Sequence, residues 1–184
     1  MNINDESISQ IMNNVEENSK LVLDSVNNIV SSYTSVLDDL MKSIADDIVY
    51  SDDVSTAIIE RYFIELSSAI YFVSGKAEHL GVYDGVSKAQ LKEKFNNLYL
   101  DNKIGIDGKN RTQAELTAFS EDGSKYESVV SDMYNRAYKI VKAKIEAAET
   151  LNTTLSKVLS HKMQQEQALS ADVAETAVKR VLNE

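Results

Sequence analysis

The chain has 184 residues, a formal net charge of −10, six glycines, and neither cysteine nor proline. The absence of cysteine excludes disulfides and thiolate metal sites, and the scarcity of glycine and proline disfavours a sheet protein, which needs many tight turns. We therefore expect an all-α fold. We also expect neither a signal peptide nor a membrane span, because no apolar run is long enough, and the cysteine-free composition fits a reducing cytoplasm.

The negative charge is concentrated in the first third of the chain. Residues 1–56 hold eleven acidic residues against Lys20 and Lys42, whereas the remainder is close to neutral. Residues 125–144 even hold five basic residues against two acidic ones. The sequence therefore predicts an acidic arm followed by a body with a locally basic surface.

The first third of the chain follows the heptad pattern of a coiled coil. From Ile8 to Leu40, apolar residues recur in steps of four and three, which predicts a long helix from Asp5 to about Ile48 inside an acidic coiled-coil segment, residues 1–50. Such a helix pairs through its apolar seam, so we assign homo-oligomerisation to six seam residues. These residues are Val15, Val22, Val26, Ile29, Val36 and Leu40.

The next stretch is expected to form two helices separated by a short break. The first begins near Val54 and ends at Leu80, where Gly81 is suited to terminate it, or earlier, at Gly75. The second starts after Ser87, a good N-terminal cap, and ends at about Asp101. We therefore expect the chain to change direction between Gly81 and Ser87.

A loop and a short helix follow. Residues 102–111 are mostly polar and include two glycines, which is typical of a loop. Thr112-Gln113-Ala114-Glu115 is a capping-box sequence and predicts a helix that continues to about Ser120. Gly123 is expected to kink or break the chain after it.

The stretch from Lys125 to about Leu169 is predicted to be the helix around which the rest of the chain is organised. It carries two adjacent apolar seams over many turns without proline or glycine, and it would be on the order of 65 Å long. So long an apolar stripe needs partner helices. We therefore expect an elongated helical bundle with two long amphipathic, coiled-coil helices, in which residues 51–169 form the body.

A separate short helix is expected at the end of the chain, residues 170–184. Ser170-Ala171-Asp172 has the composition of an N-terminal cap. The apolar residues that follow are Val173, Ala177, Val181 and Leu182.

The sequence offers little for catalysis or metal binding. His79 and His161 are far apart and belong to no ligand motif, and the acidic pairs are adjacent in sequence, so on a helix they point about 100° apart. Residues 101–108 resemble a calcium loop only faintly, because Lys103 stands where a ligand belongs. We therefore predict no catalytic residue, no metal and no cofactor.

A basic ridge on the long helix suggests binding of single-stranded nucleic acid. Arg136, Lys139 and Lys142 recur at three-residue steps beside Tyr134 and Tyr138, which combines charge for phosphates with aromatic faces for bases. Further basic residues extend this candidate surface: Lys88, Lys92, Lys94, Lys109 and Arg111. The alternative is commoner in general, since tyrosines at helical spacing usually belong to a core and lysines usually solvate a surface.

The order of these pieces from Ile58 to about Gln164, a little over half the chain, resembles the small helical proteins of tailed phages related to the recombination mediator UvsY. The resemblance rests on an aromatic-rich helix at 62–72, Lys-Glu-Lys-Phe-Asn-Asn-Leu-Tyr at 92–99, and Tyr-Asn-Arg-Ala-Tyr-Lys at 134–139 in the long helix. Its most distinctive part is the Gly-Lys-x-x-Thr-x-Ala-Glu turn at 108–115.

The resemblance implies a non-enzymatic phage protein in the host cytoplasm that binds single-stranded DNA, assembles as a homo-oligomeric ring and helps to load a RecA-like recombinase onto strands covered by single-strand binding protein. It places the basic residues named above against DNA and the C-terminal helix in the oligomer. Two alternatives remain open. One is a structural protein, such as a virion component, scaffold or chaperone, without affinity for DNA, and the other is an inhibitor of a host DNA-binding protein that acts through the acidic arm.

Overall fold

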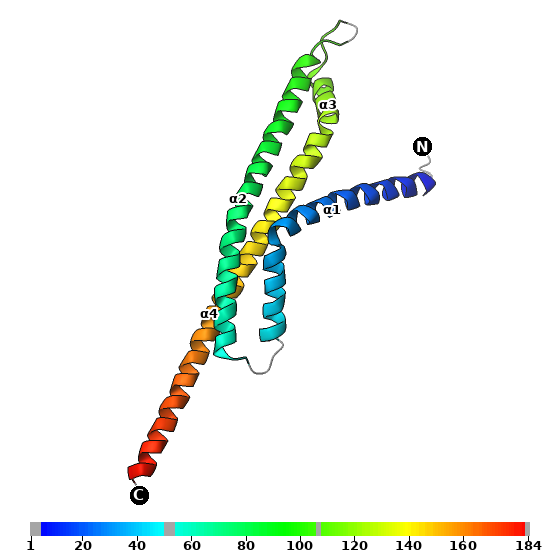
Figure 1. The fold of residues 1–184 in the computed structure, drawn as a ribbon. Coiled ribbons are helices and arrows are strands. Elements are labelled where there is room, and N and C mark those ends of the chain that lie inside the picture. Colours follow the sequence, from blue (N-terminus) through cyan, green and yellow to red (C-terminus); the bar gives the residue numbers. More distant parts are fainter. Residues whose placement is uncertain (1–4, 50–53, 106–107, 183–184) are drawn as a thin grey trace. The chain divides into compact units, whose positions relative to one another are not determined.

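The computed structural model describes the backbone of residues 5–49, 54–105 and 108–182, and the side chains of residues 12–48, 54–105 and 108–173. This part of the chain forms four α-helices (Figure 1). They are α1 (Asp5–Ile44), α2 (Thr56–Asp101), α3 (Gln113–Gly123) and α4 (Lys125–Leu182), and a π-helical turn, Ala45–Val49, follows α1. The described residues contain no strand beyond one isolated bridge between Ile104 and Asn110. The expected all-α fold with long helices is confirmed.

The helices form two compact units, each assembled from segments that are distant in sequence. Unit 1 comprises Met1–Tyr33 and Gly75–Lys142, and unit 2 comprises Thr34–Ser74 and Ala143–Glu184. Helices α1, α2 and α4 each contribute one stretch to both units. Neither unit is therefore a continuous segment of the sequence.

The core of unit 2 consists of large aliphatic side chains. Leu37 and Ile44 of α1, and Ile59 and Leu66 of α2, are at most 1% exposed, and Leu155 of α4 is also buried. Burying a side chain of this size stabilises a fold by about 1.5–3 kcal/mol. Apolar residues at three- and four-residue steps on three helices thus account for the packing of this unit.

Polar contacts fix the register of the three helices in unit 2. Lys144 of α4 donates hydrogen bonds to the Asp38 carboxylate (2.5 Å) and to the Thr34 hydroxyl (3.2 Å), both on α1. The Asn152 amide of α4 donates to the Ser67 hydroxyl of α2 at 2.9 Å. Because each contact joins different helices at one defined pair of positions, a shift by a turn would break it.

The interior of unit 1 is made largely of small and polar side chains. Leu80 and Val141 are fully buried, but so are Ala77 and Ala137. Five polar residues are also buried here, on α2 (Asp84, Ser87), α3 (Ser120), the residue between α3 and α4 (Ser124) and α4 (Ser131). Small side chains let helices approach closely, which is the packing seen where Gly81 meets the ring of Tyr138.

The predicted helix break between Gly81 and Ser87 is wrong, because α2 is continuous from Thr56 to Asp101. A Cβ at position 81 would lie 3.2 Å from the Tyr138 ring, so this glycine provides space rather than a helix end. The Ser87 hydroxyl donates to the Asp84 carbonyl oxygen, three residues earlier in the same helix. Glycine and serine are both common at helix ends, but here both residues lie in the middle of a continuous helix.

The predicted start of a separate helix at Ser170 is also wrong. Helix α4 runs without interruption from Lys125 to Leu182. The Ser170 hydroxyl donates to the Glu166 carbonyl oxygen at 2.8 Å, so its hydrogen bond goes back into the helix instead of capping a new one.

The expected loop, capping box and break at Gly123 are confirmed. Gly108 has a positive φ of 75°, and the loop is closed by backbone hydrogen bonds that include Arg111 N–H to the Lys103 carbonyl. Thr112 caps α3, with reciprocal hydrogen bonds between Thr112 and Glu115. Helix α3 ends at Gly123, and α4 begins two residues later.

Candidate nucleic-acid interface

The basic ridge of α4 is partly available to a ligand. Arg136 and Lys139 are exposed on the side of the helix away from the buried Ala137 and Val141. Neither forms an ion pair with any residue in the described part of the chain. These two residues are therefore the unneutralised cations of the ridge.

Lys142, the third residue of the ridge, forms an ion pair within unit 1. Its ammonium group lies 3.1 Å from a Glu78 carboxylate oxygen of α2 and 5.6 Å from the centre of the Tyr138 ring. The hydrogen bond to Glu78 raises the pKa of Lys142. A phosphate would have to compete with Glu78 for this lysine.

The predicted lysines of α2 do not form one surface. Lys88 is paired with Asp84 at 2.7 Å, and Lys92 lies one turn further along the same side of the helix. Lys94 is exposed but is two residues from Lys92, so it points to a different side. Lys88 and Lys92 thus flank one edge of α2, while Lys94 lies elsewhere.

The two basic residues before α3 differ in exposure. Lys109 is exposed in the loop, whereas Arg111 is half-buried, with its guanidinium 5.1 Å from the centre of the Phe119 ring. The Arg111 Nη1 atom is buried without a hydrogen-bond partner. Hydrogen bonds from Thr112, first from its backbone N–H, lower the pKa of Glu115, which keeps a carboxylate at the start of α3. Arg111 therefore packs against the protein more than it faces solvent.

The predicted tyrosines serve mainly in packing. Tyr134 and Tyr138 are both half-buried; Tyr134 lies 5.8 Å from Tyr83, centre to centre, and Tyr138 lies against Gly81. Burial raises the pKa of Tyr33 on α1, with Tyr83 and Tyr134 contributing. Of these rings, only Tyr83 is exposed.

The most exposed aromatic residue of α4 escaped the sequence prediction. Tyr126 is 75% exposed, and the Lys125 ammonium lies 5.8 Å from the centre of its ring. No pattern in the sequence indicates this exposure, because position 126 lies four residues before Val130 and one heptad before Met133, and so continues an apolar seam of the long helix. An exposed ring beside a cation has the composition of a base-stacking site.

The predicted oligomerisation residues of α1 have diverse surroundings. Val15 is 58% and Val36 is 69% exposed, whereas Val22, Ile29 and Leu40 are half-buried. Val26 is buried within unit 1. Towards the C-terminal half of α1 the buried positions are Val30 and Leu37, each one residue after an expected seam position. Oligomerisation through these residues stays a prediction.

At the other end of the chain, Val173 is exposed on α4. The side chains of Ala177, Val181 and Leu182 lie outside the described residues. Their part in oligomerisation therefore also stays a prediction.

Comparisons of this chain with protein-family models, with curated proteins and with solved structures find no match. The relation to UvsY-like mediators thus stays a prediction. None of the described helices contains a stretch that is both long and apolar enough to cross a bilayer. Within the described side chains, no group of three or more His, Cys, Asp or Glu residues is placed to hold a metal ion.

Proposed function

We propose that this protein is a non-enzymatic phage accessory protein that self-associates, binds single-stranded DNA and helps to load a RecA-like recombinase onto strands covered by single-strand binding protein in the host cytoplasm. The observation that carries the proposal is the pair Arg136 and Lys139 on α4, exposed about one turn apart and free of ion pairs with described residues. Two exposed cations about one helical turn apart can contact neighbouring backbone phosphates.

The proposed mechanism is electrostatic. Each phosphate that Arg136 or Lys139 neutralises releases condensed counterions, which favours binding at low salt. The exposed rings of Tyr83 and Tyr126 offer faces on which bases stack, each worth about 1–3 kcal/mol. Because one chain supplies few contacts, self-association multiplies them along a single strand.

A second candidate function is a helical structural or interaction protein without affinity for DNA, such as a virion component, scaffold or inhibitor of a host DNA-binding protein. The ion pairs favour it: Lys88, Lys142 and Lys144 are already neutralised by Asp84, Glu78 and Asp38. The net charge of −10 also repels nucleic acid at long range. This candidate predicts no binding to DNA at physiological salt.

Fluorescence anisotropy with a labelled single-stranded oligonucleotide across a salt series separates the two candidates. We expect the wild-type protein to bind with an affinity that falls steeply as salt rises. The Arg136→Ala/Lys139→Ala variant should bind about ten-fold or more weakly, and its slope of log affinity against log salt should be smaller by the equivalent of up to two phosphate contacts. Lys76→Ala/Lys157→Ala removes the same charge from two exposed lysines outside the ridge and serves as the matched control.

The outcome that contradicts DNA binding is equally clear. A folded protein that fails to bind the oligonucleotide at low salt, or that binds with equal affinity in the ridge variant and the control, leaves the structural or interaction protein as the better account. A further readout is ATP hydrolysis by a RecA-like recombinase on strands coated with single-strand binding protein. The mediator proposal requires the wild-type protein to stimulate it and the ridge variant to do so less.

A further inference from the structure

The basic ridge of α4 turns towards α2 at its third residue. Each three-residue step along an α-helix rotates the side chain by about 60° relative to the one before. Lys142 therefore lies about 120° around α4 from Arg136. Its ammonium group accordingly reaches α2, where it lies 3.1 Å from a carboxylate oxygen of Glu78. Glu78 thus stands at the α2 end of the ridge, where the third cation would otherwise meet a phosphate.

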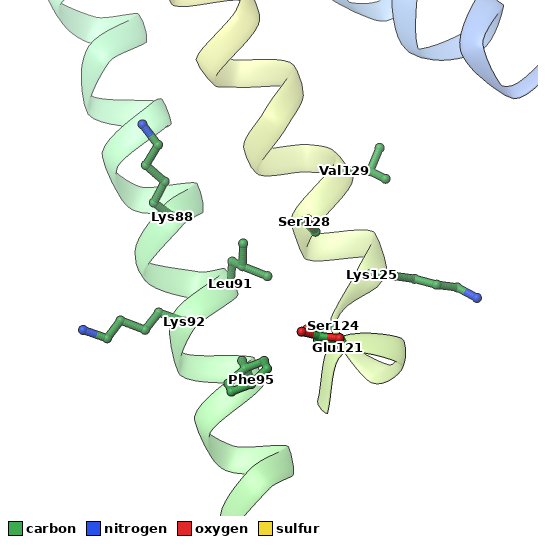
Figure 2. A pocket seen from close by; sticks show the side chains of 9 residues that line it. All are labelled: Lys88, Leu91, Lys92, Phe95, Glu121, Ser124, Lys125, Ser128 and Val129. Atoms are coloured by element: carbon green, nitrogen blue, oxygen red, sulfur yellow. The ribbon is translucent and has the colours of Figure 1, made fainter. Parts of the chain in front are cut away.

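Other lysines of unit 1 do not extend the ridge. Figure 2 shows the ammonium groups of Lys88 and Lys92 of α2 directed away from α4, and that of Lys125 of α4 directed away from α2. Lys88 is in addition paired with Asp84 at 2.7 Å. A strand that lies on Arg136 and Lys139 therefore gains its next contact at Lys142.

Lys142 has a second contact that does not depend on Glu78. Its ammonium group lies 5.6 Å from the centre of the Tyr138 ring, one helical turn earlier on α4. That ring is itself confined, because a Cβ at Gly81 would lie only 3.2 Å from it. The attraction between a cation and an aromatic face needs no carboxylate. Lys142 therefore stays oriented on the same side of α4 when Glu78 moves away.

The ion pair between Glu78 and Lys142 is suited to exchange. The side chain of Glu78 is 70% exposed and that of Lys142 is 43% exposed, so water solvates both when they separate. The Glu78 carboxylate has no other hydrogen bond or ion pair with the residues that the structure describes. Ion pairs as exposed as this one contribute little to stability and are screened by salt. A phosphate can therefore replace the carboxylate.

Glu78 also forms one wall of a shallow hollow on α2. The hollow has a volume of about 260 Å³, and its other walls are His79, Val82 and Tyr83. Val82 and Tyr83 are both exposed. An exposed aromatic ring offers a face on which a base stacks. A strand that takes the place of Glu78 on Lys142 therefore meets a stacking surface in the adjoining hollow.

We propose that Glu78 is an autoinhibitory gate of the ridge, which takes the place of a phosphate on Lys142 until single-stranded DNA exchanges the carboxylate for a phosphate of its own. Contacts at Arg136 and Lys139 hold the strand beside Lys142, so its next phosphate competes with Glu78 at high local concentration. The bound strand then extends from the ridge towards Tyr83. The inference rests on DNA binding by the ridge in the proposed function and adds an intramolecular competitor to it.

A double-mutant cycle in the full-length protein tests the gate by fluorescence anisotropy with a labelled single-stranded oligonucleotide. Lys142→Ala should weaken binding and reduce the slope of log affinity against log salt by about 0.7, the value for one phosphate contact on a single strand. Glu78→Gln should tighten binding about three-fold or more, because the competing charge is removed. In the Lys142→Ala background, Glu78→Gln should have no effect beyond that of the control.

Glu93→Gln is the matched control. Glu93 is an exposed acid of α2 in the same unit and forms no ion pair with the described residues. Its substitution measures the general gain from removing one negative charge. Because the Glu78 side chain is mostly exposed, thermal unfolding of Glu78→Gln should match that of the control. A purely structural role of Glu78 would alter thermal unfolding and would not couple DNA affinity to Lys142.

Three results overturn the gate. If Glu78→Gln binds no more tightly than Glu93→Gln, Glu78 does not compete with DNA. If its gain persists in the Lys142→Ala background, Glu78 repels the strand without acting through Lys142. If Lys142→Ala binds with the wild-type affinity and salt slope, the strand does not reach Lys142.

The fate of the proposed function is read separately. In each of these three cases, binding that still depends on Arg136 and Lys139 refutes the gate and leaves DNA binding by the ridge intact. Absence of binding at low salt in both the wild-type protein and Glu78→Gln removes DNA binding and the gate together. Binding by Glu78→Gln alone supports the gate in its strongest form.

Discussion

Units 1 and 2 share helices α1, α2 and α4, and unit 1 also contains α3, but the two units bury different kinds of side chain. In unit 2 the interior is aliphatic, with Leu37, Ile44, Ile59, Leu66 and Leu155, and Thr34 is the one buried polar side chain among its described residues. In unit 1 five polar side chains are buried, and two of its buried apolar residues on α2 and α4 are alanines.

The difference indicates that unit 2 contributes more of the hydrophobic stabilisation than unit 1 does. Large aliphatic side chains contribute most of the hydrophobic free energy of folding, whereas serines and alanines bury little apolar area. Unit 1 in turn carries the proposed DNA-binding ridge on α4, the exposed Tyr83 and Tyr126, and a groove lined by Leu91 and Phe95 of α2. Regions that bind partners commonly have lower local stability.

Truncating a core residue of unit 2 should have the largest effect. Leu66 is fully buried, so Leu66→Ala should lower the free energy of unfolding by about 2–5 kcal/mol. Urea denaturation followed by circular dichroism measures it. Ile64→Ala, at an exposed position two residues away, is the control and should change it by less than about 0.5 kcal/mol. Equal effects would refute an aliphatic core at Leu66.

Replacing the buried carboxylate of unit 1 should stabilise the protein. The Asp84 Oδ1 atom is buried without a hydrogen-bond partner, and its ion pair is with a half-exposed Lys88. We expect Asp84→Leu to raise the free energy of unfolding by about 1–3 kcal/mol, because burying an underpaired charge is costly. Asp132→Leu changes an exposed acid of the same unit and should give no such gain. A destabilised Asp84→Leu protein would mean that the polar interior of unit 1 is itself stabilising.

Two glycines of α2 in unit 1 should respond differently to the same substitution. A Cβ at Gly85 meets no atom within 4 Å, so Gly85→Ala should stabilise the helix by about 0.5–1 kcal/mol. At Gly81 the Cβ would press on the Tyr138 ring at 3.2 Å, which should cancel that gain. Thermal unfolding of the two variants side by side measures the difference. If both are stabilised equally, Tyr138 is not held tightly against α2.

Alkaline pH should modestly lower the free energy of unfolding, because the buried Tyr62 and the half-buried Tyr33 hold their phenolic protons more tightly in the folded state. The hydrogen bond to Asp47, and then burial, raise the pKa of Tyr62 in unit 2 above 10.0, and burial raises that of Tyr33 in unit 1. A raised pKa means that the folded state holds its proton more tightly, so this stabilisation is complete below pH 10 and is lost as pH rises through the folded pKa.

Urea denaturation at pH 8 and above pH 10 measures this dependence. Tyr62→Phe and Tyr33→Phe should each flatten the loss of stability above pH 10, and Tyr62→Phe should also cost about 1 kcal/mol at pH 8 through its lost hydrogen bond. An unchanged alkaline slope in both variants would show that other groups cause it.

The sequence was sufficient for the features that depend on neighbouring residues. The capping box at Thr112 and the break at Gly123 involve contacts within a few positions, and the sequence predicts both, although it places the end of the helix about three residues early, near Ser120. The long helix from Lys125 was predicted from its apolar period alone. These features need no knowledge of what packs against them.

Features that depend on distant contacts were not predictable. The sequence predicts a helix end at Gly81, because the partner that requires a glycine there, Tyr138, lies on another helix. The pairing of Lys142 with Glu78 joins residues 64 positions apart, and the sequence alone presented Lys142 as a free cation. In α1, two adjacent apolar stripes compete, and tertiary packing selects Val30 and Leu37 over Ile29 and Val36.

The pairing of α2 with α4 in unit 1 also makes the length of this unit adjustable. Gly81 lies near Tyr138 and Glu78 near Lys142, and Leu98 meets Gly123 at the end of α3, so each step forward along α2 matches about an equal step backward along the helices that face it. Seven residues make two turns and restore the helical phase. Two turns can therefore be added to or removed from facing stretches of these helices, together with the α1 stretch beside them, without changing which side chains point inward. Each such change would lengthen or shorten unit 1 by about 10 Å and leave its cross-section unchanged.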